Sequence, residues 1–202
     1  RLPRALADDP TPAGMGDDLI ESHIAGQLTE TFDPQHGGWG TDAKFPLPRT
    51  IEFALKRERQ QALQTLDAIA QHLYDRVDGG FFRFATNRNW SEVRHEKVIE
   101  ENAALLRAFA NAYLYTGDDA YRQPAARTVE YLTSTLWTGI AVGGSQGPGQ
   151  GAAYYSLAAD ERVDHESPRT DLTVFAGGNA LVADCLLTYH SYTDDETARS
   201  YA

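Results

Sequence analysis

The sequence predicts an all-α fold built from helical hairpins, and three observations support that prediction. Apolar residues recur every three or four positions in several segments, which is the spacing of one face of a helix. Glycine-rich stretches such as residues 143–151 separate those segments. One helix–turn–helix segment also occurs twice at a fixed offset. Stacked helical hairpins would give this combination.

The repeated segment gives the clearest indication of architecture. Each copy reads as a helix, a tight turn whose aspartate caps the next helix, and the start of that return helix. Such hairpins stack so that each buries its neighbour's apolar face. The second copy reaches Ala202 barely two turns into its return helix, so we expect further hairpins in a longer parent protein. The matching positions, 77 residues apart, are Asn102-Ala103, Tyr115-Thr116-Gly117-Asp118 and Arg122 against Asn179-Ala180, Tyr192-Thr193-Asp194-Asp195 and Arg199.

The first three helices follow from local patterns. Ile20, Ile24 and Leu28 recur every four residues and predict a helix over 17–31, which turn residues end. A proline at position 48 can open a second helix, because its missing N–H is unpaired in a first turn anyway. A third helix is expected over 59–74, with Leu63, Leu66, Ile69, Ala70 and Leu73 on one face.

The second half of the chain follows the same rules. Residues 81–85 are expected to form a short strand after a glycine pair. A long helix is expected from about His95 to Tyr115, and the next over 120–136. Residues 143–151 are expected to be a flexible loop, and a last long helix should run from near Asp171 to Tyr192.

Composition excludes several classes of function. The 202 residues carry a net charge of −11, with 29 acidic and 18 basic side chains, which disfavours nucleic-acid and anionic-membrane binding. No apolar run is long enough for a transmembrane helix, and the first residues do not resemble a signal peptide, so a cytoplasmic location is expected. The acidic, lysine-poor composition indicates a halophilic source, with a GC-rich genome as the alternative explanation. Cys185, the single cysteine, is expected to be buried and inert.

One dense stretch, residues 79–97, indicates a binding surface. It combines glycines, aromatic residues, arginines and a Glu-Lys pair. Such a mixture suits a concave, polar-lined surface on which a hydroxyl-rich ligand could lie against aromatic faces.

A set of motifs spread along the chain resembles one known family. The motifs are Asp33 with Gly37-Gly38-Trp39-Gly40, Ala43-Lys44-Phe45-Pro46, Gly79-Gly80-Phe81-Phe82-Arg83-Phe84, Trp90, Glu96-Lys97, Asn102-Ala103 and Asn179-Ala180. In this order they resemble the thioredoxin-domain-containing, spermatogenesis-associated protein 20-like family (DUF255, YyaL-type).

The resemblance implies a fold and a domain organisation. The family joins an N-terminal thioredoxin-like domain to an (α/α) toroid of the six-hairpin glycosidase and N-acylglucosamine 2-epimerase type. Residues 17–202 would then be an incomplete toroid of about three hairpins with short β-hairpin insertions. Residues 1–16 would be the linker from a missing thioredoxin-like domain, which would be a partner within the parent chain.

The chain departs from the family pattern near its candidate catalytic residues. Where the family has Pro-His-x-Glu-Lys, this chain has Val93-Arg94-His95-Glu96-Lys97. On a helix, a shift of one residue turns a side chain by about 100°. His95 therefore cannot simply take over the role of the family histidine.

Glu96 and His95 are the predicted catalytic residues, as a general acid and base. Each has an ordinary alternative: Glu96 could be a carboxylate favoured at a helix N-terminus, and His95 a packed or surface histidine. A glycosidase would need two carboxylates, and Glu96 with Asp171 is the pair to test.

The predicted ligand-binding residues carry charge, amide groups or aromatic faces. For Lys44 and Arg83 a structural ion pair is the alternative. Asn102 and Asn179 occupy equivalent repeat positions, which also fits a structural role. The full set is Lys44, Phe45, Arg83, Phe84, Trp90, Arg94, Lys97, Asn102 and Asn179.

Together these observations predict a carbohydrate-active domain, either a sugar epimerase or isomerase. The alternative is a non-catalytic sugar-binding or protein-interaction module that serves the thioredoxin-like domain. A small sugar-type ligand is expected, without a cofactor or a metal ion.

Overall fold

The computed structural model describes residues 17–202, and the linker predicted for residues 1–16 lies outside them. Seven helices of six or more residues make up its body: α1 (Asp17–Thr31), α2 (Pro48–Arg57), α3 (Arg59–His72), α4 (Ile99–Thr116), α5 (Asp119–Ser134), α8 (Ala176–Thr193) and α9 (Glu196–Tyr201). Two single-turn helices, α6 (Ala152–Tyr155) and α7 (Ala159–Arg162), lie between α5 and α8.

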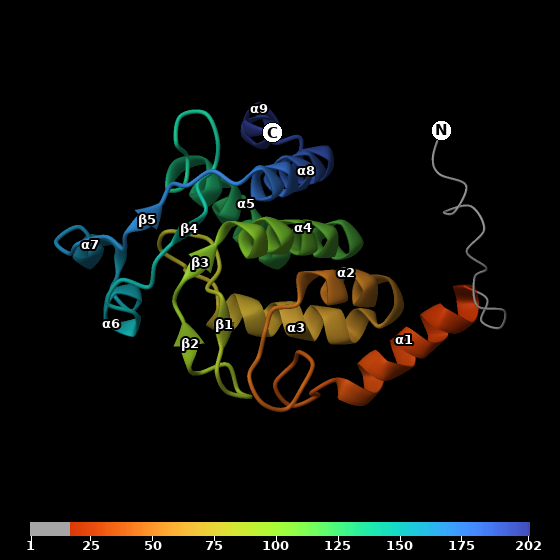
Figure 1. Cartoon of the computed structure of the whole chain (residues 1–202). Helices are drawn as coiled ribbons and strands as arrows, with labels where there is room; N and C mark the ends of the chain where they lie inside the picture. The colour runs from red at the N-terminus through yellow and green to blue at the C-terminus, as the bar shows by residue number, and fades with distance from the viewer. Residues whose placement is uncertain (1–16) are drawn as a thin grey trace, which may run out of the picture.

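The helices form three hairpins, α2–α3, α4–α5 and α8–α9, and the repeat predicts the last two. In the first layer α4 packs between α2 and α8, while α3, α5 and α9 form a second layer behind their hairpin partners (Figure 1). The core lies between the layers and includes Leu66, Leu106, Phe109, Leu132 and Leu186. Cys185 is also buried there, and burial raises the pKa of its thiol to about 12. Within residues 17–202, none of the helices combines the length and apolar character needed to cross a bilayer.

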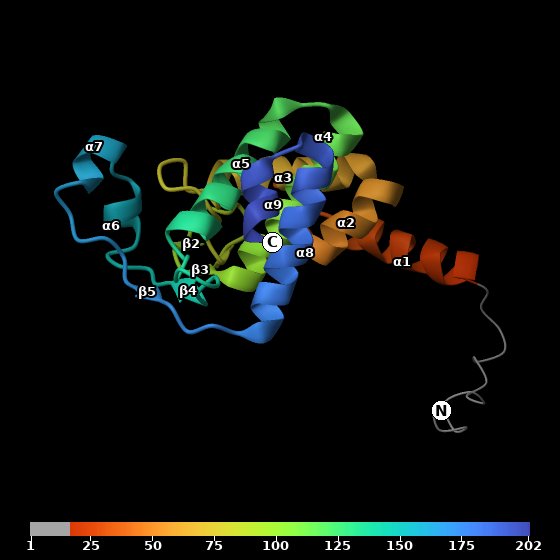
Figure 2. The same ribbon diagram turned by 90° about the horizontal axis from the view of Figure 1, so that it is seen from above.

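Three long connections, residues 32–47, 73–98 and 135–175, each lead into the N-terminus of a first-layer helix. They carry five two-residue strands: β1 (Phe84–Ala85), β2 (Val93–Arg94), β3 (Lys97–Val98), β4 (Ser145–Gln146) and β5 (Thr170–Asp171). Strands β1 and β2 form an antiparallel hairpin, and β3, β4 and β5 form an antiparallel sheet in that order. Figures 1 and 2 show the strands together at one end of the helices, with α6 and α7 projecting from that end.

The predicted start of the long central helix is wrong by four residues. Helix α4 begins at Ile99, and the residues from His95 to Val98 are extended. Lys97 and Val98 pair with β4 as β3, and the Lys97 side chain turns inward to a buried carboxylate. Helix α8 begins at Ala176 instead of Asp171 for a similar reason. Asp171 belongs to β5 and pairs with Ser145 of β4.

The turns of the two repeats confirm the predicted caps. The Asp118 carboxylate accepts a hydrogen bond from the Ala120 N–H at 2.9 Å, and the Asp195 carboxylate accepts one from the Ala198 N–H at 2.9 Å. The residue before each cap has a left-handed backbone, with φ of 69° at Gly117 and 56° at Asp194. The glycine is the easier of the two residues in that conformation.

Asn102 and Asn179 have the same structural role in the two repeats. The Asn102 amide accepts from the Phe81 N–H at 2.6 Å and donates to the Phe81 carbonyl at 3.1 Å. The Asn179 amide makes the same pair of bonds with Val142, at 2.8 and 2.9 Å. Each asparagine thus fixes the preceding loop to its helix, which leaves its amide little capacity for a ligand.

Replacement of Asn102 by alanine should lower the free energy of unfolding by about 2–3 kcal/mol. The substitution leaves the N–H and carbonyl of Phe81 without their buried partner. Urea denaturation measures the change. Asn89→Ala, at an exposed loop position, is the control and should cost less than about 0.5 kcal/mol. Equal losses in the two variants would contradict the role assigned to Asn102.

Candidate functional site

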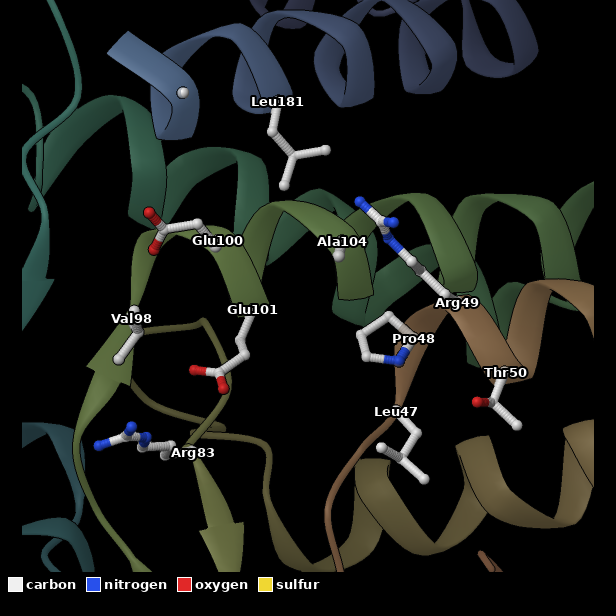
Figure 3. Close-up of a pocket in the computed structure, with 11 residues that line it drawn as sticks. Leu47, Pro48, Arg49, Thr50, Arg83, Val98, Glu100, Glu101, Ala104 and Leu181 are labelled. Atoms are coloured by element: carbon white, nitrogen blue, oxygen red, sulfur yellow. The ribbon is translucent and has the colours of Figure 1, made fainter. Parts of the chain in front are cut away.

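A cavity of about 640 Å³ opens at the N-terminal ends of α2, α4 and α8 (Figure 3). The first turns of these helices contribute Arg49, Glu101 and Gly177, and the loop before β1 contributes Arg83. The apolar part of the wall comes from Leu47, Pro48, Val98, Ala104 and Leu181. A concave site with apolar walls and a few charged groups has the size and character of a small-molecule pocket.

Glu101, in the wall of this cavity, has a raised pKa. It is half-buried, and its Oε2 has no hydrogen-bond partner among the described residues. Burial raises the pKa of Glu101, nearby Arg83 opposes that shift, and the neighbouring carboxylates Glu100 and Glu96 add to it. Figure 3 shows the Glu101 carboxylate directed toward Arg83. A carboxylate with a raised pKa in a cavity is a typical general acid or base.

Arg83 acts electrostatically on Glu101 and forms an ion pair with Glu96. Its Nη1 donates to Glu96 Oε2 at 2.7 Å, and both side chains are partly exposed. The pair raises the pKa of Arg83, which therefore stays charged. Arg83 thus forms the ion pair given above as the alternative to ligand binding, and it also lines the cavity.

The structure does not bring Glu96 and His95 together. Successive side chains of an extended segment point to opposite sides. Glu96 and Val98 face the cavities, whereas His95 and Lys97 face the interior. The His95 ring stacks on Tyr155 at 5.4 Å between ring centroids, and burial lowers the pKa of its imidazole. The predicted acid–base pair therefore does not share a site, because this segment is a strand instead of a helix.

A second, smaller cavity of about 320 Å³ adjoins the first. Arg83, Val98 and Glu100 line both cavities. The second one extends between β4, β5 and the start of α8, and Glu96 and Asp171 both line it. The structure thus brings together the two carboxylates predicted as a glycosidase pair, although Glu96 is bound to Arg83.

Lys44 and Lys97 are both fully buried in ion pairs. Lys44 Nζ donates to Asp33 Oδ2 at 3.0 Å and to the Gly40 carbonyl at 2.7 Å. Lys97 Nζ donates to Asp75 Oδ2 at 2.8 Å and to the Gly79 carbonyl at 2.8 Å, and it lies 4.6 Å from the centroid of the Tyr131 ring. Lys44 therefore forms the structural ion pair given above as its alternative. The ammonium group of Lys97, predicted to bind ligand, is likewise occupied by a buried ion pair.

The two aspartates of these pairs were not among the predicted site residues. A sequence signal for them exists, because Asp-x-x-x-Gly-Gly followed by an aromatic residue occurs at Asp33 and again at Asp75. In both turns Oδ1 accepts the N–H groups two and three residues further on, at 3.0–3.3 Å. The repeated motif therefore marks a buried carboxylate that shapes a turn and receives a lysine.

Arginines complete both ion pairs. Arg88 donates to both oxygens of Asp33, and with Lys44 it holds the pKa of that carboxyl well below its ordinary value. Arg162 of α7 donates to Asp75 at 3.0 Å. Burial alone would raise the pKa of Asp75, but Lys97 and Arg162 outweigh it and keep the pKa lowered. Both carboxylates are therefore ionised at neutral pH.

The remaining predicted ligand residues are divided between the core and the surface. Trp90 is buried, and its Nε1 donates to the His36 carbonyl at 2.9 Å. Phe45 and Phe84 stack at 4.6 Å between centroids, with Phe45 exposed beside the first cavity's Leu47 wall. Arg94 is exposed on β2, opposite Phe84 in the register. None of these four lines either cavity. Among residues 17–202 no group of histidine, cysteine and carboxylate side chains is arranged to hold a metal ion.

Sequence comparison relates the chain to one mammalian protein. Spermatogenesis-associated protein 20 of Mus musculus is 32% identical over 145 residues, which cover 65% of this chain and 18% of that protein. The Homo sapiens protein is 31% identical over 123 residues, or 54% of this chain and 16% of that protein. The chain resembles the toroid portion of this family. It spans less than a fifth of the length of these relatives. No protein-family model matches the sequence.

Solved structures confirm the predicted toroid fold. Cellobiose 2-epimerase from Bacillus thermoamylovorans has a TM-score of 0.67 at 14% identity, over 90% of this chain and 50% of that chain. The Spirochaeta thermophila enzyme of the same name gives 0.61 at 18% identity, over 90% and 51%. A D-mannose isomerase gives 0.58 at 12% identity, over 93% and 50%. The chain is thus a partial (α/α) toroid that spans about half of each neighbour.

The buried aspartates should make the protein sensitive to acid. A carboxyl group whose pKa is lowered on folding stabilises the fold above its unfolded pKa, about 4. That contribution is lost as the pH falls toward the folded pKa. Asp33→Asn should therefore be less stable at pH 7, and its stability should change less between pH 5 and pH 2 than that of the unmodified chain. Urea denaturation across that range measures both effects.

The exposed Asp42 provides the control for this experiment. Asp42→Asn should follow the unmodified chain at every pH. An Asp33→Asn profile parallel to that of the unmodified chain would show that the buried carboxylate does not contribute to the acid sensitivity.

Proposed function

We propose that this domain acts on a sugar as an epimerase or isomerase, with Glu101 as the general base. The observation that carries the proposal is the buried, unpaired Oε2 of Glu101 in the cavity at the mouth of the toroid. Such an atom has no structural partner to lose when it binds a substrate. The raised pKa of Glu101 also brings the group closer to the range in which general bases work.

The proposed chemistry starts from the open-chain form of a reducing sugar. The Glu101 carboxylate takes the proton from the carbon next to the carbonyl, and the bonding electron pair moves onto the carbonyl oxygen. Arg83 stabilises the negative charge that forms on that oxygen. Return of the proton to the same carbon on its other face gives the epimer. Return to the neighbouring carbon, with transfer of the deprotonated carbon's hydroxyl proton to the former carbonyl oxygen, gives the isomer. In epimerisation Glu100, the other carboxylate of the same cavity, takes up a proton from the solvent and delivers it to the other face, and Glu101 releases its proton to the solvent, so both carboxylates are restored.

Two features outside the cavity support the proposal. The fold neighbours include two cellobiose 2-epimerases and a D-mannose isomerase, although low identity limits that likeness to the fold. The proposed steps are proton transfers within one substrate, so they need neither a redox cofactor nor a metal ion. We further propose that a thioredoxin-like domain precedes residues 17–202 in the parent protein and that the protein is cytoplasmic.

A non-catalytic, sugar-binding role is the second candidate. The departure from the family pattern favours it, because Arg94 is exposed in the family's histidine position and His95 packs into the interior. A domain that has lost its catalytic histidine could keep a pocket for sugars. Turnover separates this role from the first, since both roles require binding.

The first experiment is a thermal-shift screen of the chain against monosaccharides, disaccharides, amino sugars and sugar phosphates, in high salt. A ligand of the folded state raises the melting temperature. Each hit is then incubated with the protein and its products are analysed by NMR. Glu101→Gln should keep the thermal shift and lower turnover by at least about a hundredfold, because the amide cannot accept the proton.

Glu30→Gln, on the exposed surface of α1, is the control and should keep both properties. Binding without turnover in the unmodified chain would support the non-catalytic role. A screen without any thermal shift would contradict both functions.

The pH dependence of turnover provides a separate test. Because the general base must be ionised, kcat/KM should rise with pH through the pKa of Glu101, which burial holds above the ordinary value of 4.5. Arg83 lowers that pKa, so Arg83→Ala should move the acid limb of the profile to higher pH. Arg76→Ala, at an exposed position outside both cavities, should leave the limb unchanged. A limb that does not move in Arg83→Ala would show that another group is the base.

A further inference from the structure

The two cavities form one continuous groove. Arg83, Val98 and Glu100 line both, so the second cavity begins at the wall of the first. The groove runs from the start of α2, past the start of α4, to the start of α8. At about 320 Å³ the second cavity has half the volume of the first, and the proposed chemistry at Glu101 does not use it.

Phe175 gives the second cavity an aromatic surface. It immediately precedes α8 and is 51% exposed, although an aromatic ring normally loses most of its contact with water on folding. The ring is nevertheless held in place, because it packs on the backbone of Gly144. A Cβ atom at Gly144 would lie 2.9 Å from the Phe175 ring. The ring therefore lies against Gly144 through two of its carbon atoms and exposes the rest of its surface to the solvent.

The polar groups of the second cavity are also held in place. Asp171 Oδ1 accepts the N–H and the hydroxyl of Thr173, at 3.0 and 2.7 Å. Those bonds fix the carboxylate and leave Oδ2 without a hydrogen bond from the described residues. Glu96 is fixed by Arg83 at 2.7 Å. A fixed aromatic surface with hydrogen-bond acceptors beside it matches a sugar ring, which has an apolar C–H face and hydroxyl groups around its edge.

We infer that the second cavity is a second saccharide subsite, so that the ligand is at least a disaccharide. One sugar unit lies against Glu101 and Arg83, and the next lies on Phe175 with hydroxyl groups at Asp171. This inference rests on the proposed function, because it assigns a sugar to the first cavity. Beyond that function, the inference specifies the length of the ligand and the residues that recognise its second sugar unit.

Isothermal titration calorimetry with matched sugars tests the subsite. The probes are glucose with cellobiose and maltose, and mannose with mannobiose. At least one disaccharide should bind more tightly than its monosaccharide. Phe175→Ala should weaken binding of that disaccharide by about tenfold and leave monosaccharide binding unchanged, because only the second unit contacts the ring. Leu187→Ala, on the same helix and 50% exposed, is the control and should change neither affinity.

A second variant tests the role of the ring without removing it, in case Phe175→Ala disturbs the local fold. Gly144→Ala should displace the Phe175 ring by steric contact and should reduce the disaccharide preference while Phe175 itself is present. Circular dichroism verifies the helical content of each variant.

The outcomes separate the subsite from the proposed function. Equal affinities for monosaccharides and disaccharides, or a disaccharide preference that survives in Phe175→Ala, would overturn the subsite and leave the sugar function intact. Absence of binding by every sugar would overturn the proposed function and the subsite together.

Discussion

The buried ion pair between Lys97 and Asp75 is the interaction on which the mouth of this domain depends. It holds Lys97 inside, so the neighbours of Lys97 in the extended segment, Glu96 and Val98, must face outward to the cavities. The same carboxylate caps its own turn through Oδ1. A buried ion pair contributes little net stability, because desolvation offsets most of the attraction. Its effect here is to select one orientation of the strand that leads into α4, and with it the side chains of the site.

The three connections are held against the helices that follow them by different side chains. The first uses Asp33 with Lys44, and the second uses Asp75 with Lys97. The third has Thr138 at the equivalent position and relies on the Asn179 amide. It is also the longest, and its helix α7 sends Arg162 back to Asp75, a contact that ties the third connection to the second. Asp75 therefore joins the second and third connections, and Asp33 joins the first and second through Arg88.

The sequence predicted what local periodicity and capping determine. Helix positions, the hairpin repeat and the caps at Asp118 and Asp195 all follow from spacing, because a residue's neighbours three and four positions away decide them. The start of α4 did not follow, because it depends on pairing between β3 and β4, which are about 48 residues apart. Glu101 was not among the predicted site residues for the same reason, because the cavity beside it is formed by α2, α8 and the Arg83 loop. The repeated Asp-x-x-x-Gly-Gly motif was visible in the sequence and would have identified both buried aspartates.

The charges around the two cavities decide whether the groove favours a neutral or an anionic ligand. Three helix N-termini meet there, and each carries the equivalent of about half a positive charge. Arg83 and Arg49 add two more positive charges, while Glu96, Glu100 and Glu101 supply three negative charges. The sum is close to neutral, and Asp171 lowers it further at the far end of the groove. Without those carboxylates three converging helix N-termini would form an anion site. The glutamates occupy that position, so the groove is a poor anion site, and under the proposed function it would favour a neutral sugar over a sugar phosphate.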